Sequence, residues 1–178
     1  MNFKKFSTVF FLLGAIVLMS FNLPKKLQKK VNKQIKKTFD IEQFQLEPIS
    51  INDSVNQQLT YKLGKDNLFK IQKADELIGY AFVAKAPSKT DEFDYLILLD
   101  KNLIIAKTKI LIYREDYGGE IGSRRWLKQF IGKSSKDKLT YEKDIVAISG
   151  ATISAHSMTI AVNQFLQNLA ILHQNKVL

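Results

Sequence analysis

The sequence contains no cysteine and only two histidines among its 178 residues. Without cysteine the chain forms no disulfide and no thiolate metal site, and cysteine usage gives no indication of the redox compartment. His156 and His173 are 17 residues apart and do not form a helical ligand pair, which disfavours a zinc or haem site. Any demanding chemistry is therefore expected to come from a cofactor that metal ligands do not hold.

Several catalytic motifs are also missing. The chain has no G-x-G-x-x-G, no P-loop and no G-x-S-x-G elbow, and its Asp and Glu residues are scattered along the sequence. No pair of carboxylates stands out as a general acid and base. The sequence therefore predicts neither a catalytic residue nor a metal ligand.

The first 24 residues have the pattern of a signal peptide or a membrane anchor. Lys4 and Lys5 precede an uncharged stretch, residues 6–24, whose strongly apolar part spans residues 9–21. A cationic start before an apolar core of this length is typical of a secretory signal, and the whole stretch is just long enough to span a bilayer. We expect residues 1–24 to be this leader or anchor and residues 25–178 to form one domain. The expected location is the cell envelope, on the periplasmic side of the inner membrane.

The net charge of +10 is concentrated in one segment. Seven lysines and no acidic residue lie between Lys25 and Lys37, whereas the rest of the chain is closer to balance. Lysines directly after an apolar run oppose export of that side, by the positive-inside rule. On an anchored protein they would meet the membrane surface and contact anionic lipid. Because no aromatic residue is interleaved with them, we expect no nucleic-acid binding.

Apolar spacing predicts a mixed fold of α-helices and β-strands. Leu27, Val31, Ile35 and Phe39 recur every four residues, which indicates a helix with a narrow apolar stripe. This helix packs on the domain in one interpretation and lies on a lipid surface in the other. Residues 44–67 are expected to form a polar connection with one short strand.

Residues 68–86 and 93–115 each contain two β-type runs around a turn, at residues 74–76 and 100–102. A glycine-rich loop, residues 116–122, and a short helix that ends at Gly132 follow. The last helix has a stripe of core residues, Met158, Val162, Phe165, Leu169 and Leu172. The predicted fold class is α+β: an antiparallel sheet flanked by an N-terminal basic amphipathic helix and a C-terminal helix.

Ser149, Gly150, Ala151 and Thr152 separate an apolar run from this last helix. The free backbone N–H groups and the dipole of a helix N-terminus bind phosphate. Serine and threonine at such a point are also ordinary N-caps. From these four residues alone, both hypotheses stay open.

Three stretches, in order, resemble the FMN-binding domain family. The family includes the C subunit of sodium-translocating NADH:quinone reductase and the G subunit of the Rnf electron-transport complex. The stretches are DELIGYAFVAKA at residues 75–86, DKNLIIAKTKILIYREDYGGEIG with the following WLKQFIG at residues 100–132, and AISGATISAHSMTIAVN at residues 147–163. The resemblance begins at about Phe69, covers roughly the last 110 residues, and implies FMN as the cofactor.

In this family the threonine that ends the Ser-Gly-Ala-Thr motif carries FMN through a phosphodiester, and a separate flavin transferase installs it from FAD with magnesium. The resemblance therefore implies that Thr152 is the attachment residue. Gly150 and Ala151 would keep it accessible, and Ser149 and Ser154 would donate hydrogen bonds to the phosphate.

The resemblance also implies a wider flavin site. Glu115 and Gly118 stand at the two ends of the family's E-T-P-G loop and are candidate neighbours of the flavin. Trp126, Tyr113 and Tyr117 are candidates to stack on the ring, with core packing as the alternative for each. His156 lies one helical turn after Thr152 and either reaches the phosphate or is a plain surface residue.

Two functions follow from these features. The first is an exported or membrane-anchored FMN-binding electron-transfer protein that works with a redox partner protein in or at the membrane. Such a protein is a carrier or a subunit of a redox system rather than a self-sufficient enzyme. The alternative is a non-covalent flavin-binding or flavin-free envelope adaptor. It is favoured by the basic cluster and by Val146, which stands where the family usually has Asp.

Overall fold

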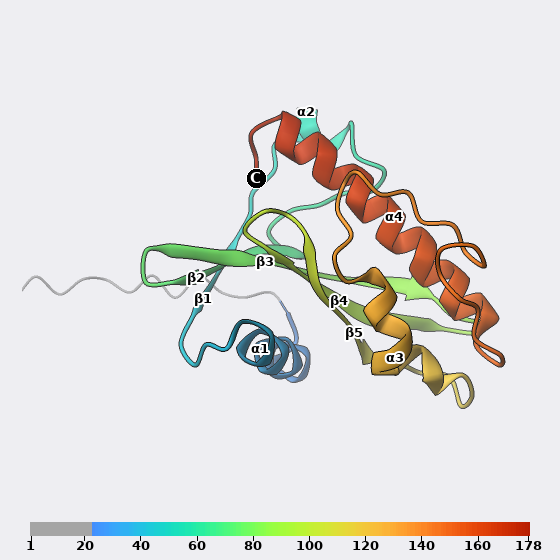
Figure 1. Ribbon diagram of the computed structural model, residues 1–178. Helices are drawn as coiled ribbons and strands as arrows, with labels where there is room; N and C mark the ends of the chain where they lie inside the picture. The colour runs from blue at the N-terminus through green and yellow to red at the C-terminus, as the bar shows by residue number, and fades with distance from the viewer. Residues whose placement is uncertain (1–22) are drawn as a thin grey trace, which may run out of the picture.

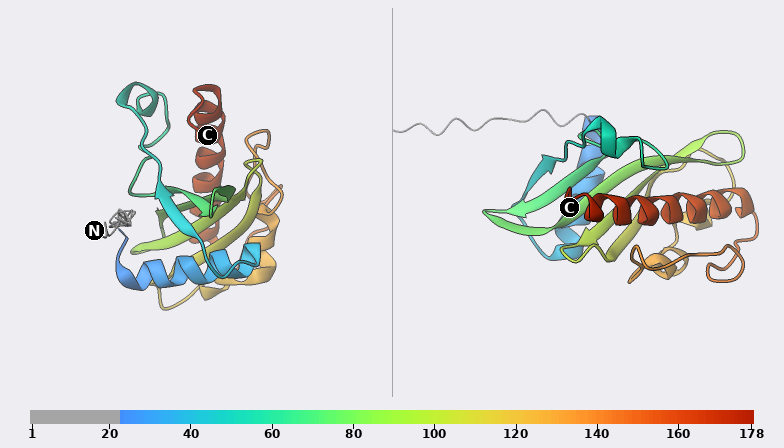
Figure 2. Two further views of the ribbon diagram at one scale, coloured as in Figure 1. Left: turned by 90° about the vertical axis from the view of Figure 1, so that its left-hand side faces the viewer. Right: turned by 90° about the horizontal axis from the view of Figure 1, so that it is seen from above.

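A computed structural model describes residues 23–178, so the predicted leader falls almost entirely outside the described residues and stays a prediction. The described chain forms a five-stranded antiparallel sheet in which each strand pairs with the next along the sequence. The strands are β1 (Gln45–Pro48), β2 (Leu68–Lys73), β3 (Glu76–Pro87), β4 (Glu92–Asp100) and β5 (Ile105–Ile112). Helix α1 (Lys25–Phe39) covers one face and α4 (Thr152–Gln174) covers the other, as Figures 1 and 2 show. The predicted α+β class is confirmed.

The central strands β3 and β4 are buried on both faces, because successive side chains of a strand point to opposite sides of the sheet. Phe82 and Tyr95 belong to the core beneath α4, whereas Ala81 and Leu96 belong to the core beneath α1. Phe82 stacks on Phe165 of α4 with ring centroids 4.1 Å apart. The two cores together fix both helices against the sheet.

Helix α1 uses its apolar stripe inside the domain. Leu27, Val31 and Ile35 are buried against the sheet, with Phe39 partly buried beside them. The predicted helix is therefore confirmed, and its apolar stripe is occupied by protein rather than presented to lipid. The lysines lie on the remaining surface of the helix.

The predicted turns are also confirmed. Asp100 Oδ1 accepts hydrogen bonds from the backbone N–H groups of Asn102 and Ile104, at 2.8 and 3.0 Å. Between β2 and β3 the chain turns at Ala74, which has a positive φ of 52°. The short helix is present as α3 (Arg124–Leu127) and the 3-10 turn η2 (Lys128–Phe130), and it ends before Gly132.

Two further short elements complete the described chain: α2 (Asp53–Asn56) in the polar connection and the 3-10 turn η1 (Gly119–Gly122) in the glycine-rich loop. Residues 133–151 contain no helix or strand, and the side chain of Asn163 on α4 hydrogen-bonds the backbone of Leu139 in this segment. Of the helices within residues 23–178, none has the length and apolar character needed to cross a membrane.

Gly79 in β3 marks a close approach that tolerates no side chain. A Cβ atom at this position would lie 2.2 Å from the carbonyl oxygen of Leu99 and 3.2 Å from the ring of Phe39.

We expect Gly79→Ala to lower the free energy of unfolding by about 1–3 kcal/mol, because the β3–β4 pairing must open to admit the methyl group. Gly122→Ala is the control, since a Cβ there meets nothing within 4 Å. Urea unfolding should separate the two variants, and equal midpoints would contradict this account.

Candidate functional site

Three segments meet at one end of the sheet. The turn between β3 and β4, the chain that leaves β5 and the N-terminus of α4 surround a cleft of about 520 Å³. In an antiparallel meander β3 ends, β4 begins and β5 ends at the same end of the sheet. The topology therefore brings the β3–β4 turn and the chain that leaves β5 together. The cleft is lined by Lys89, Thr90, Tyr113, Glu115, Asp116, Tyr117 and residues 150–154.

The N-terminus of α4 has no side-chain cap. The helix begins at Thr152, its N-cap is Ala151, and no side chain accepts a hydrogen bond from its first turn. The hypothesis that a serine or threonine hydroxyl caps this helix is therefore wrong. Because the first N–H groups of a helix have no partner within the helix, they remain available to an anion in the cleft.

Thr152 itself is exposed, and its hydroxyl donates a long hydrogen bond of 3.4 Å to the carbonyl of Ile148. A bond of this length holds the hydroxyl weakly. Gly150, two residues earlier, has a φ of +79° with nothing within 4 Å of its Cβ position. Its left-handed backbone, rather than a lack of space, therefore favours glycine. Both features leave the Thr152 side chain open to another molecule.

The glycine-rich loop packs directly against the Ser-Gly-Ala-Thr segment. Gly118 has a φ of +81°, and a Cβ there would lie 2.8 Å from the carbonyl oxygen of Gly150 and 3.0 Å from the Cβ of Ala151. Two segments that are far apart in the sequence are thus brought into contact through a residue without a side chain.

Tyrosines form one wall of the cleft. The Tyr113 hydroxyl lies 3.1 Å from the hydroxyl of Ser154, which is buried. The Tyr113 ring also lies 6.1 Å from the ring of Phe93 in the core, so it is anchored at both ends. Tyr117, in contrast, is 85% exposed at the edge of the cleft. A large aromatic side chain left in solvent beside a cleft is available to cover a bound ring system.

Glu115 fastens the hairpin turn to the loop after β5. Its carboxylate accepts hydrogen bonds from the backbone N–H and the hydroxyl of Thr90, at 2.6 and 2.8 Å, and from the N–H of Asp91 at 3.2 Å. The nearby hydroxyl of Ser88, followed by the N–H and hydroxyl of Thr90, lowers the pKa of Glu115 to about 2. The carboxylate is therefore ionised and held in place, so it positions the cleft and does not act as a free base.

A second hydrogen bond holds the same turn from the other side. The hydroxyl of Ser157, in the second turn of α4, donates to the carbonyl of Pro87 at the end of β3. The turn is therefore fastened both to the loop after β5 and to α4, and all three walls of the cleft are connected.

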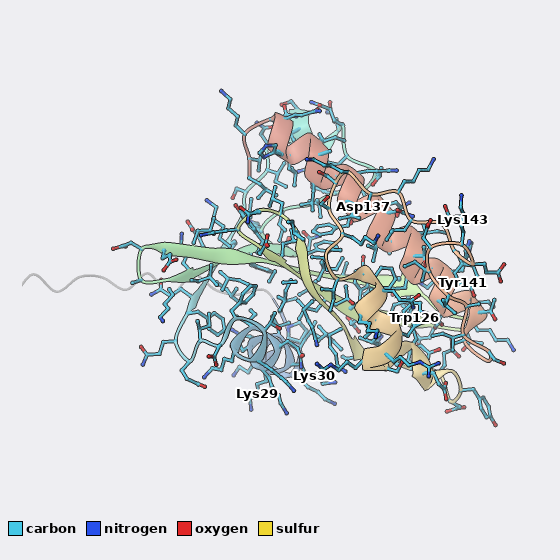
Figure 3. The ribbon with its side chains drawn as sticks, in the orientation of Figure 1. Lys29, Lys30, Trp126, Asp137, Tyr141 and Lys143 are labelled. Atoms are coloured by element: carbon cyan, nitrogen blue, oxygen red, sulfur yellow. The ribbon has the colours of Figure 1, made fainter. Side chains whose placement is uncertain are left out.

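Four residues singled out in the sequence do not line the cleft: Gly118, which packs behind its wall against Gly150 and Ala151, and Trp126, Ser149 and His156. Figure 3 labels Trp126 beside α3. Its side chain is buried, packs edge-on against Phe130, and donates from its indole Nε1 to the carbonyl of Val146 at 2.7 Å. Ser149 is exposed outside the lining. The ring of His156 contacts Tyr141, 5.2 Å away, on another side of α4. Trp126 thus supports the loop before the motif and does not stand beside the cleft.

The cleft also contains residues that the sequence did not single out, namely Lys89, Thr90, Asp116 and Ile153. Lys89 and Thr90 belong to a turn with no recognisable motif. Only the strand order could have indicated them, because it places their turn at the end of the sheet where β5 also ends. Lys89 is exposed and supplies a positive charge beside the helix N-terminus. Within residues 23–178, no group of three or more histidine, aspartate or glutamate side chains is placed to hold a metal ion.

The low pKa of Glu115 makes the cleft sensitive to acid. A carboxylate whose pKa is lowered on folding stabilises the protein above its unfolded pKa, and this contribution is lost as the pH falls from about 4.5 towards about 2. We expect Glu115→Gln to lower the melting temperature at pH 7, and the difference from wild type to shrink over that range. Thermal unfolding monitored by circular dichroism at several pH values tests this. A difference that is the same at pH 7 and pH 2.5 would contradict it.

The comparison with known proteins agrees with this geometry. Residues 89–167 match the family model of the FMN-binding domain. The match includes every residue that lines the cleft, but it begins after the end of β3, so the stretch at residues 75–86 lies outside it. No curated protein matches the chain. This match to the FMN-binding domain family supports flavin binding and indicates FMN as the cofactor.

Proposed function

We propose that this protein is an electron carrier of the cell envelope, with FMN attached through its phosphate to Thr152. The observation that carries the proposal is the position of Thr152. It is the first residue of a 23-residue helix without a side-chain cap, and it opens onto a cleft of about 520 Å³. That volume lies within the usual range for cofactor sites.

The residues around the cleft fit the chemistry of FMN. Backbone N–H groups at the start of α4, the hydroxyl of Ser154 and the ammonium group of Lys89 are suited to a phosphate. Tyr113 and Tyr117 offer aromatic surface to the ring system. When bound, FMN supplies the redox chemistry, and the chain's own residues hold and orient it.

Covalent attachment needs only the exposed hydroxyl on this chain. The Thr152 oxygen forms a bond to the phosphorus of the FMN half of FAD, the phosphoanhydride bond breaks, and AMP leaves as the hydroxyl proton is lost. A separate flavin transferase would supply the catalytic groups and the magnesium. The small residues Gly150 and Ala151 leave the approach to Thr152 unobstructed.

Electron transfer, rather than catalysis of a substrate reaction, agrees with the state of the cleft. Its Glu115 is bound to the hairpin turn, so it is not available as a base. An electron carrier needs a redox partner, which we place in or at the membrane. The envelope location rests on the pattern of residues 1–24, and a covalent tether would keep the flavin of an exported protein from diffusing away.

Val146 bears on how the transferase recognises the chain. Its side chain is 67% exposed, while its N–H donates to Gln129 and its carbonyl accepts from Trp126. The backbone is therefore fixed and the side chain is presented to solvent, three residues before Ser149. Asp144 does not replace the missing acid, because its carboxylate accepts from the N–H of Thr140 within its own turn.

Attachment at Thr152 predicts a clear result on a denaturing gel. When the full chain is co-expressed with a flavin transferase, we expect a fluorescent protein band and an FMN-sized mass increase on the peptide that contains Thr152. Thr152→Ala should abolish both, whereas the control Ser149→Ala should keep both. Flavin that copurifies with the native protein but is lost on denaturation would instead support non-covalent binding. Protein without any flavin would support the adaptor.

The position of Val146 yields a second prediction. We expect Val146→Asp to increase the fraction of chain that carries FMN after limited co-expression, because an acidic side chain would stand where the family usually has one. The free energy of unfolding should change by no more than about 0.5 kcal/mol, since the side chain is exposed. Mass spectrometry of the intact protein gives the labelled fraction. An unchanged fraction would show that the transferase does not read this position.

A further inference from the structure

A second and larger concavity lies on the α1 side of the molecule. Helix α1, strand β5 and the α3–η2 segment border a groove of about 900 Å³. Its floor includes β5 from Ala106 to Leu111, and its walls carry positively charged side chains from all three elements. Six of these are Lys33, Lys37, Lys107, Lys109, Arg124 and Lys128.

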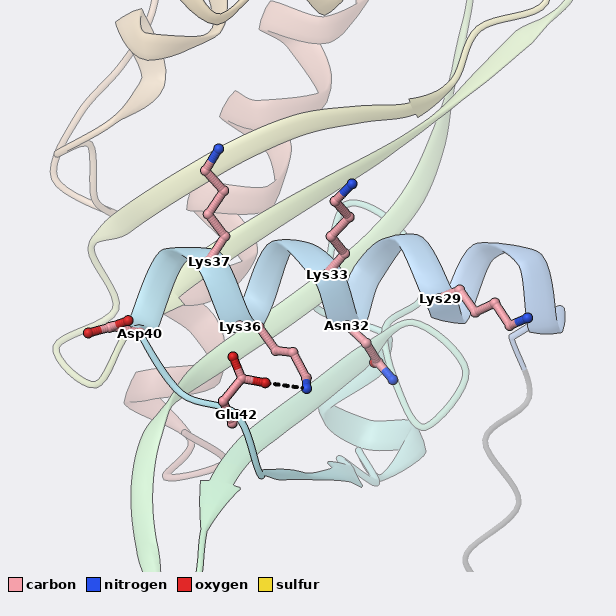
Figure 4. Close-up of a pocket in the computed structure, with 7 residues that line it drawn as sticks. All are labelled: Lys29, Asn32, Lys33, Lys36, Lys37, Asp40 and Glu42. Carbon is pink, nitrogen blue, oxygen red and sulfur yellow. Dashed lines mark hydrogen bonds and ion pairs between the residues drawn. The ribbon is translucent and has the colours of Figure 1, made fainter.

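The charges of this groove are not balanced by the protein. No aspartate or glutamate lines it, and none of the six side chains makes an ion pair with the acidic residues that the structure describes. Lys33 and Lys37 extend from one side of α1, whereas Lys36 turns towards Glu42 and pairs with it at 2.7 Å (Figure 4). A seventh cation, Lys30, donates to the carbonyl of Leu111 at the end of the floor.

The crowding of these cations contributes to a shift in the pKa of one of them, Lys107. Partial burial, followed by the positive charges of Arg124, Lys109 and Lys37, lowers the pKa of Lys107. Cations that repel one another at short range are stabilised by an anion that enters between them. The groove therefore has the electrostatics of an anion-binding surface.

Its shape and lining favour one class of polyanion. The cations converge on a recess from three elements, whereas a bilayer surface meets side chains that project from a convex face. No aromatic residue lines the groove, so it offers no platform for stacking of nucleic-acid bases. Apolar surface lies beside the cations at Ile131, which is 45% exposed. Mixed acidic and apolar side chains on an extended protein segment complement such a lining.

We propose that this groove binds an acidic segment of the protein that exchanges electrons with the flavin. The chain that leaves the floor strand β5 connects the two sites, because Leu111 of β5 lies in the groove and Tyr113, directly after the strand, lines the flavin cleft. Two residues along a strand span about 7 Å, so a partner seated in the groove extends naturally to the cleft. The identity of the partner as an electron donor or acceptor rests on the proposed function, whereas the binding of an acidic segment does not.

The test uses the full chain in non-ionic detergent and a fluorescent peptide of alternating glutamate and leucine. Fluorescence anisotropy measures its dissociation constant at low and high salt. The groove variant is Lys33→Gln, Lys37→Gln and Arg124→Gln, all at exposed positions, and a second groove variant is Lys107→Gln with Lys109→Gln. The matched controls remove three charges elsewhere: Lys25, Lys26 and Lys29 to Gln on α1, and Lys62, Lys65 and Lys143 to Gln far from α1.

We expect the three-charge groove variant to weaken peptide binding roughly tenfold, the order expected for the loss of three partly screened charge pairs. Both controls should change it less than about threefold, and salt should weaken it. Thr152→Ala should bind the peptide like wild type, so failure of flavin attachment and failure of the groove proposal remain distinguishable.

Three results would overturn the proposal. Equal weakening by the groove variant and both controls would show attraction to net charge alone. Groove-dependent binding to micelles containing phosphatidylglycerol, without binding of the peptide, would assign the groove to lipid. Groove-dependent binding of a single-stranded DNA oligomer, again without the peptide, would assign it to nucleic acid.

Discussion

The burial of β3 and β4 on both faces is the constraint on which the rest of the molecule depends. Side chains such as Phe82 on one face and Leu96 on the other are fully buried only when α4 and α1 cover the sheet from opposite sides. Removal of this apolar surface from water is the main stabilising contribution of the fold. It also determines where α4 begins, because Met158, Val162 and Phe165 fix the helix along the sheet.

The position of α4 on the sheet in turn determines where the cleft forms. The first residues of α4 stand at the sheet edge where the β3–β4 turn and the end of β5 also lie. Gly118 permits the close contact between the loop and the Gly150 carbonyl, and Glu115 and Ser157 hold the turn from two sides. The parts of the cleft that touch a ligand are thus short loops, but each one is fastened to a buried strand or helix.

The sequence predicted the regular elements well because their residues carry the periodicity of burial. The four-residue steps of Leu27, Val31 and Ile35 and the turn at Asp100 were visible without a structure. The Ser-Gly-Ala-Thr segment and Gly118 were recognised through the family resemblance. Trp126 was misleading, since a tryptophan in a family-like stretch does not reveal whether its indole faces a ligand or, as here, a backbone carbonyl.

The residues that the sequence did not predict are far apart along the chain and come together only in the folded structure. Lys89 and Thr90 belong to a turn whose role appears only when the sheet edge is assembled, and Lys107 and Arg124 approach α1 only after the strand order is known. The lysines of α1 look like a uniform basic run in the sequence. The fold divides them, with Lys36 paired to Glu42 and with Lys33 and Lys37 beside the groove.

This division of charge gives the two proposed sites opposite roles towards a partner. The flavin cleft contains Glu115 and Asp116, and a phosphate on Thr152 would add further negative charge there. An acidic partner would be repelled from the mouth of the cleft and attracted to the groove. Charges of opposite sign on neighbouring surfaces steer a partner into one orientation and raise the rate of productive encounter. The groove would therefore determine how the partner docks, and the cleft would then be reached from the side of β5, along the chain that runs from the groove floor into the cleft.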